Sequence, residues 1–258
     1  MTSTQLMEID YAGRVAVVTG AARGIGAGLV SAFADAGAAV LALDRDAAEL
    51  AAAQESRHDR RVVTEAVDVT QWEDVAAAAQ EARSRWGRLD VWVNCAGVFP
   101  QAPLEEVTAD HLAATFAVNV HGAVAGAQAA AQHLTHGSGA IINVSSIAAT
   151  RPRPGRLAYG TSKAALEQAT RCLAVELAPY GIRANAIAPG YIDTAMLDWI
   201  RRDAQATQQA TFEVPLGRIG CVDDIVNTAL FLASDAAAYI TGVVLPVDGG
   251  LRATTARP

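Results

Sequence analysis

The sequence predicts an α/β fold in which helices cover both faces of one parallel sheet. Short apolar segments rich in Val, Ile and Ala alternate with longer, Ala-rich segments of helical pattern along the chain. A glycine-rich turn joins the first apolar segment directly to the first helical one. No linker and no repeat of fixed period interrupts the alternation, so we expect a single domain over residues 1–258.

The first unit of the chain is a strand, a turn, a helix and a second strand. Residues 14–19 form a β-branched run typical of a buried parallel strand. The glycine-rich turn, residues 20–26, ends this strand, and the helical pattern that follows runs to Ala36, before Gly37. Residues 39–43 form the second apolar strand, which ends at Asp44.

This unit has the residues that dinucleotide binding requires. Glycines at a helix N-terminus let a pyrophosphate approach the backbone N–H groups, where the helix dipole also favours negative charge. Asp44 can accept hydrogen bonds from the adenosine ribose hydroxyls and would repel a 2′-phosphate. Arg23 and Arg45 argue slightly the other way, because either could pair with that phosphate. We therefore predict NAD as the cofactor in preference to NADP.

The alternation continues with helices over residues 46–56 and 71–86 and strands over residues 61–67 and 89–93. Asp68 follows the third strand, where we expect the adenine of the cofactor, and the alternative is that it caps the next helix. Small residues follow the fourth strand and would let a cofactor run across the strand ends. Among them, Cys95 is interpreted as a packed thiol, since no histidine lies nearby in sequence.

The residues with the clearest chemical use surround the fifth strand, residues 140–144. Tyr159 and Lys163 are four residues apart near the start of a helix predicted over residues 159–180, so both side chains leave the same face. An ammonium beside a phenol favours phenolate and moves proton exchange closer to neutral pH. Ser146, at the exit of the strand, could place a hydroxyl beside that phenol, and together they could hold a substrate oxygen and move its proton.

The remaining segments complete the alternation. A long helix predicted over residues 108–134 contains Asn119 between apolar neighbours, so we expect its amide to be buried and hydrogen-bonded. The less regular segment 191–220, which includes Met196, Leu197, Trp199 and Ile200, is either a substrate lid or a packed surface helix. The other predicted elements are a strand, a helix and a final strand, over residues 182–188, 222–233 and 242–247.

Composition excludes several classes of protein. The chain has 258 residues, 52% of them hydrophobic, and a formal net charge of -7, which disfavours nucleic acid and anionic membranes as partners. Cys95, Cys172 and Cys221 suggest a reducing compartment and form no zinc pattern, and no histidine shares a spacing that suggests a metal. Residues 1–11 lack the features of a secretory signal, and no apolar run reaches membrane-spanning length. We expect a cytoplasmic protein without a metal.

Motifs along most of the chain occur in one characteristic order: Thr19-Gly20-Ala-Ala-Arg-Gly24-Ile-Gly26, Asp68-Val69, Asn94-Cys-Ala-Gly97, Asn119, Ser146, Tyr159-x-x-x-Lys163, Pro189-Gly190 and Asp248-Gly249-Gly250. In this order and spacing they resemble the short-chain dehydrogenase/reductase family, over about residues 13–251. The resemblance implies a doubly wound Rossmann fold with a seven-stranded parallel sheet. It also implies a homotetramer built on the two long helices around Asn119 and Tyr159.

The resemblance implies a role for each matching residue. Tyr159 is the acid/base, and Lys163 lowers its pKa and binds the nicotinamide ribose. Ser146 orients the substrate oxygen, and Asn119 holds a water that links Lys163 to solvent. Besides Tyr159 and Lys163, the residues expected to bind the cofactor are Gly20, Arg23, Gly24, Ile25, Gly26, Asp44, Arg45, Asp68, Val69, Asn94, Ala96, Gly97, Pro189, Gly190, Ile192 and Thr194.

The sequence thus predicts a dehydrogenase that transfers a hydride between NAD and a secondary alcohol or ketone, such as a polyol, a sugar or a small hydroxy compound. One alternative is an NADPH-dependent 3-oxoacyl-ACP or 3-oxoacyl-CoA reductase. Such reductases often have a basic residue where this chain has Tyr180, and Asp44 disfavours NADPH. Arg151, Arg153 and Arg156 could recruit an anionic substrate or carrier, or could form a solvated loop. A second alternative, a non-catalytic NAD-binding protein, is disfavoured by the complete catalytic set.

Overall fold

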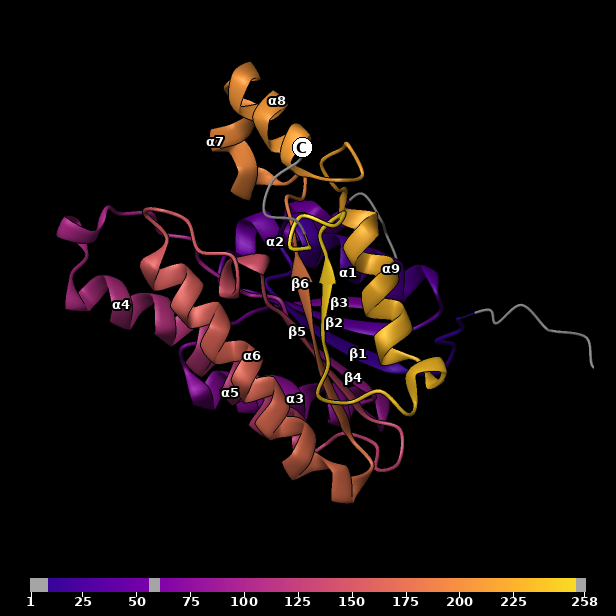
Figure 1. The fold of residues 1–258 in the computed structure, drawn as a ribbon. Helices are drawn as coiled ribbons and strands as arrows, with labels where there is room; N and C mark the ends of the chain where they lie inside the picture. The colour runs from indigo at the N-terminus through magenta and orange to yellow at the C-terminus, as the bar shows by residue number, and fades with distance from the viewer. Residues whose placement is uncertain (1–8, 56–60, 254–258) are drawn as a thin grey trace, which may run out of the picture.

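The computed structural model describes residues 9–55 and 61–253, and its centre is a seven-stranded parallel sheet (Figure 1). The strands lie in the order β3-β2-β1-β4-β5-β6-β7. The chain therefore starts in the middle of the sheet, winds outward to β3, returns to β4 and winds outward again, so that β1 and β4 flank the switch point. This confirms the predicted doubly wound sheet. The strands are β1 (Val15–Thr19), β2 (Ala39–Asp44), β3 (Val62–Ala66), β4 (Val91–Asn94), β5 (Ala140–Val144), β6 (Arg183–Pro189) and β7 (Val244–Val247).

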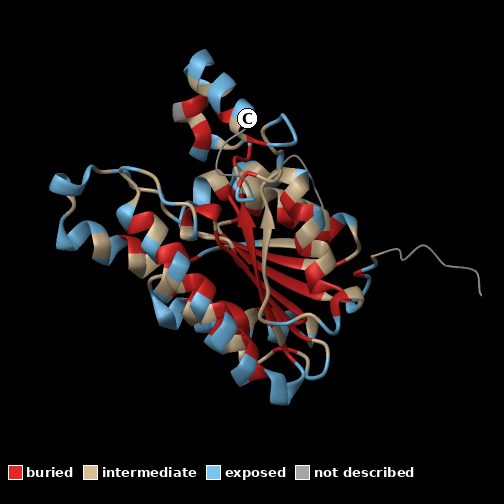
Figure 2. Cartoon of the chain, viewed as in Figure 1, coloured by how far each residue is buried: buried red, intermediate tan, exposed pale blue. Residues whose placement is uncertain are grey.

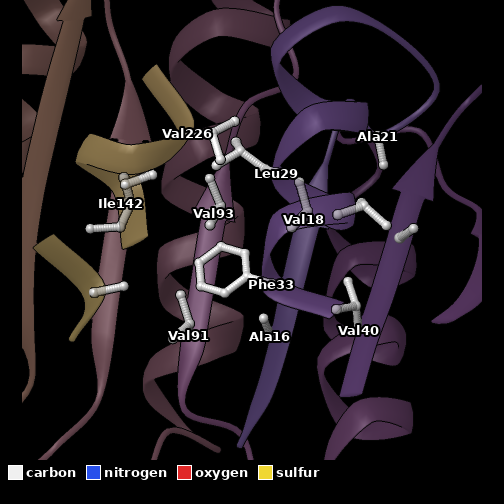
Figure 3. Close-up of a cluster of buried hydrophobic side chains, with 14 of the residues drawn as sticks. Ala16, Val18, Ala21, Leu29, Phe33, Val40, Val91, Val93, Ile142 and Val226 are labelled. Atoms are coloured by element: carbon white, nitrogen blue, oxygen red, sulfur yellow. The ribbon is translucent and has the colours of Figure 1, made fainter. Parts of the chain in front are cut away.

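Helices cover both faces of the sheet. One face carries α1 (Gly24–Asp35), α2 (Ala47–Glu55) and α9 (Val222–Ala233), and the other carries α3 (Trp72–Trp86), α5 (Ala123–Ala131) and α6 (Leu157–Leu177). The inner strands β1, β2, β4, β5 and β6 are almost entirely buried, whereas the edge strands β3 and β7 are more exposed (Figure 2). On the first face the ring of Phe33 lies over β1 and β4, beside Val18, Val91 and Val93 (Figure 3). Burial of such a side chain contributes about 3 kcal/mol.

The helix predicted over residues 108–134 is interrupted. It consists of α4 (Ala109–Phe116), a π-helical turn η2 (Ala117–Gly122) and α5. Gly122 lies so close to the segment after β3 that a Cβ there would come within 2.8 Å of Val69 Cγ2. The wider turn contains the buried Asn119, and π-helical turns occur frequently at functional sites. This interruption depends on contacts between elements, which the helical pattern of the sequence does not contain.

The segment 191–220 contains the short helices η5 (Ala195–Leu197), α7 (Asp198–Arg201) and α8 (Ala204–Glu213). It stands at the end of the sheet toward which β6 and β7 point (Figure 1). Its apolar side chains form a small core of their own with residues of the main body: Ile147, Tyr191, Leu197, Ile200, Ala210, Val214 and Leu251. The side chain of Trp199 lies outside what the structure describes.

The other short helices are η1 (Leu104–Glu106), η3 (Ile147–Ala149), η4 (Ala178–Tyr180) and η6 (Asp235–Ala237). Ser56, where a predicted helix ends, and residues 1–8 of the N-terminal segment lie outside the described residues. Within residues 9–55 and 61–253, no helix combines the length and the apolar character needed to cross a membrane.

Candidate active site

A cavity of about 280 Å³ lies at the carboxyl ends of the strands, across the switch point between β1 and β4. It brings together nearly every residue that the sequence predicts for the site. Those that line it are Gly20, Arg23, Gly24, Ile25, Gly26, Asp44, Arg45, Asp68, Val69, Ala96, Gly97, Ser146, Tyr159, Lys163, Pro189, Gly190, Ile192 and Thr194. Two predicted residues, Asn94 and Asn119, lie behind its wall.

In the glycine-rich turn, Gly20 and Gly26 lie directly against neighbouring backbone, as we expect for a turn that binds a dinucleotide. Gly20 has a φ of +67°, and a Cβ there would come within 2.7 Å of the Ala96 Cα. A Cβ at Gly26 would overlap the carbonyl oxygen of Gly20. The Thr19 Oγ1 accepts hydrogen bonds from the backbone N–H groups of Cys95 and Ala96, each at 3.1 Å, and so joins the two strands at the switch point. The turn therefore has no room for side chains where a pyrophosphate would lie.

Asp44 is fixed at the end of β2 by two backbone donors. Its Oδ2 accepts from Ala22 N at 3.0 Å, and its Oδ1 accepts from Asp46 N at 3.1 Å. A carboxylate has about four acceptor positions, so two remain for the hydroxyls of a ribose. Arg23, the nearest basic residue in the turn, forms an exposed ion pair with Glu49 at 3.4 Å.

Asp68 stabilises the turn before α3. Its Oδ1 accepts from the backbone N–H and the hydroxyl of Thr70, at 2.9 and 2.8 Å. The N-cap of α3 is Gln71, which makes no side-chain cap, so Asp68 is not itself the helix cap. With Val69 it also lines the cavity, which is compatible with the predicted contact to adenine.

The structure does not place the side chain of Asn94 in the cavity. Side chains two apart on a strand share a face, so Asn94 points to the same side as Trp92, beneath α5. There its Oδ1 accepts from Trp92 Nε1 at 2.8 Å, and its Nδ2 donates to Ala123 O at 3.0 Å and Asn143 Oδ1 at 2.8 Å. The predicted cofactor contact by this side chain is therefore not seen. Asn94 instead ties β4 to β5 and α5, which supports the cavity floor at Gly97.

Tyr159 and Lys163 are both buried, with 6% and 4% of their surface exposed. The Lys163 Nζ lies 5.8 Å from the centre of the Tyr159 ring and donates a 2.8 Å hydrogen bond to the carbonyl of Val144, the last residue of β5. Ser146 follows two residues later, and its Oγ accepts from Ala148 N at 3.1 Å. The ring of Phe99 packs edge-on against Tyr159 with centres 4.6 Å apart. The expected grouping around one phenol is therefore present.

The pKa values of this group are set mainly by burial. Burial raises the pKa of Tyr159, and a hydrogen bond with Ser146 and the charge of Arg156 oppose the rise. Burial also lowers the pKa of Lys163, to about 8. The sequence predicts that Lys163 lowers the pKa of Tyr159; in the protein alone the net pKa is nevertheless raised, because burial outweighs the groups that lower it. Removal of the phenolate from water costs more than the neighbouring charges return.

Asn119 is buried and fully hydrogen-bonded, as predicted. Its Oδ1 accepts from Val98 N at 2.8 Å, and its Nδ2 donates to Val98 O and to Ser162 Oγ, each at 3.0 Å. It lies beside Lys163: a Cβ added to Gly97 would come within 3.4 Å of Asn119 Oδ1 and 3.5 Å of Lys163 Nζ. The amide therefore joins η2, α6 and the segment after β4 beside Lys163.

Several residues of the cavity were not predicted from the sequence. Val98 and Phe99 belong to its lining, and the two residues come directly after the motif residue Gly97, in the segment after β4. That position was the one available signal, because nothing in the local pattern shows which way their side chains point.

Cys95 also lines the cavity, and burial raises its pKa to about 12, which fits the packed thiol expected for it. In the described part of the chain, no three His, Cys, Asp or Glu side chains are grouped as a metal site.

Comparison with known proteins agrees with this geometry. Residues 20–252 match the family model described as enoyl-(acyl carrier protein) reductase. The chain is 39% identical over 246 residues to cis-4-hydroxycyclohexanecarboxylate dehydrogenase of Sinomonas cyclohexanicum, covering 94% of this chain and 98% of that protein. It is 38% identical over 250 residues to L-xylulose reductase of Bos taurus, covering 96% of this chain and all of the other.

The fold is shared with solved structures as well. The structure of a gluconate 5-dehydrogenase from Burkholderia cenocepacia, solved in complex with NADP and tartrate, matches with a TM-score of 0.90 at 36% identity, over 96% of this chain and 98% of that one. Family model, relatives and fold all span nearly the whole chain and agree with the motifs in the cavity. This chain is therefore an oxidoreductase that belongs to the short-chain dehydrogenase/reductase family.

Proposed function

We propose that this protein is an NAD-dependent dehydrogenase that oxidises a secondary alcohol to a ketone, with Tyr159 as general acid and base. The observation that carries the proposal is the placement of Tyr159, Ser146 and Lys163 in the same cavity as the glycine-rich turn. A dinucleotide seated on that turn and run across the strand ends would bring its nicotinamide to the buried phenol. The complete set argues against a protein that binds NAD without turnover.

Each of these residues has a defined part in the reaction. In the oxidation, Tyr159 takes the proton of the alcohol hydroxyl while Ser146 holds the oxygen in place. When bound, NAD supplies the hydride acceptor and a positive charge that favours the phenolate. In the reverse reaction, the raised pKa of Tyr159 makes it a proton donor at neutral pH. The Lys163 ammonium, with its pKa near 8, can then return a proton to the phenolate.

Asp44 supports NAD rather than NADP. Its carboxylate lines the cavity at the end of β2, where the adenosine ribose is expected, and a 2′-phosphate there would meet a negative charge. The relative solved with NADP shows that the shared fold also accepts the phosphorylated cofactor. The preference for NAD or NADP therefore depends on the residues that this chain places beside the adenosine ribose, and Asp44 is the acid among them at the end of β2.

An acyl-carrier reductase is the second candidate, favoured by the description of the matched family model. It would use NADPH, which Asp44 opposes. The relatives act on a ring alcohol and a sugar, and their names favour a small substrate over a carrier protein.

We also propose that segment 191–220 serves as the substrate lid, since Tyr191, Ala195, Met196 and Leu197 line the cavity.

The proposed homotetramer is supported by exposed apolar side chains on and near the helix α6, such as Leu157, Val175 and Tyr180. Val175 is 76% exposed, which is unfavourable unless another copy covers it. Sedimentation of the wild type should show a tetramer, and a Val175→Asp variant should show smaller species. A monomeric wild type would reject this part of the proposal.

The test of the activity is a panel of secondary alcohols assayed with NAD and with NADP. We expect turnover with NAD and a loss of about 10²–10⁴-fold in kcat for Tyr159→Phe, the contribution of general acid–base catalysis. Titration of NADH fluorescence should give the same affinity for both proteins, because the substitution leaves the cofactor cradle intact. Full turnover by Tyr159→Phe would remove the assigned role.

A further inference from the structure

The loop between β5 and α6 brings three arginines to one end of the cavity. Arg151, Arg153 and Arg156 all belong to its lining, together with Ser146 and Tyr159. The carboxylates among the described lining residues, Asp44 and Asp68, follow β2 and β3 in the other half of the sheet. The end that holds Tyr159 is therefore positively charged, whereas at the end that would hold the adenosine Asp44 and Asp68 are accompanied by Arg23 and Arg45.

One acid serves two of these arginines. Glu213, at the end of α8, forms ion pairs with Arg151, at 3.2 Å, and with Arg153, and it accepts a hydrogen bond from the Tyr191 hydroxyl at 3.4 Å. Burial opposes ionisation of Glu213, but the two arginines hold its pKa below the usual value. The charge of Glu213 also reaches Arg156. In the described contacts of this cluster, one carboxylate therefore faces three guanidinium groups.

The arginines are not arranged like a solvated loop. The side chains of Arg151 and Arg153 are 25% and 30% exposed, whereas that of Arg202, on the surface nearby, is 83% exposed. The guanidinium of Arg153 also lies over the ring of Tyr191, 5.4 Å from its centre. Side chains held in this way are pre-organised, so they lose little entropy when they bind an anion.

Arg156 is linked to Tyr159 through the ring of Phe99. Its guanidinium carbon lies 5.1 Å from the centre of the Phe99 ring, and Phe99 in turn packs on Tyr159 at 4.6 Å. Its charge reaches the phenol of Tyr159 and opposes the rise that burial causes in the pKa there. Arg156 is half-buried, and burial lowers its own pKa, which shows that the cation is held there at a cost in hydration. The helix α6 begins at the next residue, and its N-terminus adds partial positive charge.

We propose that the substrate is a hydroxycarboxylic acid, whose carboxylate binds the guanidinium of Arg156 while its hydroxyl lies between Ser146 and Tyr159. The planar, two-pronged guanidinium matches a carboxylate, and the ring of Phe99 offers an apolar surface to the carbon skeleton between the two groups. Glu213 holds Arg151 and Arg153 as the outer wall of this subsite. The inference deepens the proposed function, on which it rests, by naming the charge of the substrate.

The first test is binding and does not depend on turnover. Calorimetry of the enzyme–NADH complex would use cyclohexanecarboxylate, its neutral counterpart cyclohexanecarboxamide, and cyclohexyl phosphate. We expect the carboxylate to bind at least about tenfold more tightly than the amide, and Arg156→Gln to remove that difference. Equal binding of acid and amide would overturn the proposal. Tighter binding of the phosphate would overturn the assignment of a carboxylate.

The second test is kinetic. A panel of hydroxycycloalkane carboxylic acids and 3-hydroxy acids would be compared with their methyl esters, which keep the shape but lack the charge. Arg156→Gln should raise KM for the acids at least about tenfold more than it raises KM for the esters, while Arg156→Lys should retain part of the preference. Arg83→Gln, on the exposed face of α3, is the matched control and should behave as the wild type.

These experiments distinguish a failure of the proposed carboxylate subsite from a failure of the proposed dehydrogenase activity. Turnover of acids and esters alike, with equal effects of Arg156→Gln on both, would overturn the carboxylate subsite and leave the dehydrogenase intact. Carboxylate binding through Arg156 with no oxidation of any alcohol would support the subsite and reject the proposed activity.

Discussion

The side-chain amide of Asn119 makes two hydrogen bonds with the backbone of Val98: the Oδ1 accepts from Val98 N at 2.8 Å, and the Nδ2 donates to Val98 O at 3.0 Å. This pairing imitates one rung of a β-ladder between a helix and a loop. It is possible because the π-helical turn η2 aims the side chain away from its own helix. The segment after β4 is thereby fixed against α6, where Ser162 accepts a further bond from Asn119.

The first prediction follows from this pairing. Asn119→Ala leaves the N–H and C=O of the half-buried Val98 without their partners, at up to about 1–3 kcal/mol for each group. We expect a fall of about 3 kcal/mol in the free energy of unfolding, measured with urea, and a lower kcat because the loop beside Lys163 is no longer fixed. Asn227→Ala, on the exposed side of α9, is the control and should change stability by less than about 0.5 kcal/mol. Equal stability of the two variants would contradict the structural role.

The second prediction concerns the glycine-rich turn. Gly26→Ala places a Cβ onto the carbonyl oxygen of Gly20, and neither backbone can yield without opening the turn. NADH affinity, measured by fluorescence titration, should fall at least about tenfold, with a lower melting temperature. Gly87→Ala separates strain from cofactor binding: Gly87 has a φ of +75° and open space around it, so this variant should lose stability but keep its affinity. Unchanged affinity in Gly26→Ala would rule out a pyrophosphate at this turn.

Most of the fold could be predicted because its causes are local. Each β-branched run is short, and each is followed by a turn and a helical pattern, so the strands of the doubly wound sheet are visible in sequence. The glycines of the turn are equally visible, since Gly20 needs a positive φ and Gly26 tolerates no Cβ. The residues that line the cavity follow from one rule, that ligands meet the carboxyl ends of parallel strands.

The remaining features depend on contacts between distant residues. The direction of the Asn94 side chain is set by Trp92, Asn143 and the close approach of α5, none of which a motif describes. The rise in the pKa of Tyr159 comes from the depth of its burial, which spacing to Lys163 cannot give. For Arg151 and Arg153 the sequence leaves a solvated loop and an anion site open, and it cannot show their ion pairs with Glu213, which lies about 60 residues further along the chain.

The third prediction is a measurement of the pKa of Lys163. Lys163 is the only lysine in the 258-residue sequence, so protein grown on lysine labelled at the ε-carbon gives a single side-chain NMR signal. That signal should titrate near pH 8 rather than near 10.5, because burial disfavours the ammonium. A midpoint close to 10.5 would mean that water reaches the ammonium, and it would contradict the burial of Lys163.

The same shift fixes the sign of a change in stability with pH. Between about pH 8 and 10.5, Lys163 is protonated in the unfolded chain and neutral in the folded one, so the unfolded state binds more protons. The contribution of Lys163 to stability therefore rises with pH in this window and is constant below it. Denaturation curves should show the wild type gaining on Lys163→Met from pH 8 to 10.5. Parallel curves over this range would contradict the shift.

The last prediction tests the choice of cofactor at Asp44. Asp44→Asn keeps the shape of the side chain but removes the charge that a 2′-phosphate would meet, while Arg23 and Arg45 remain to attract one. The ratio of kcat/KM for NAD to that for NADP should fall at least about tenfold, because a charge–charge repulsion of about 1.4 kcal/mol or more is lost. Asp46→Asn, two residues along and exposed, removes the same charge outside the cavity and should leave the ratio unchanged. If Asp46→Asn altered the ratio as much as Asp44→Asn, general electrostatic attraction rather than a ribose contact at Asp44 would decide the cofactor.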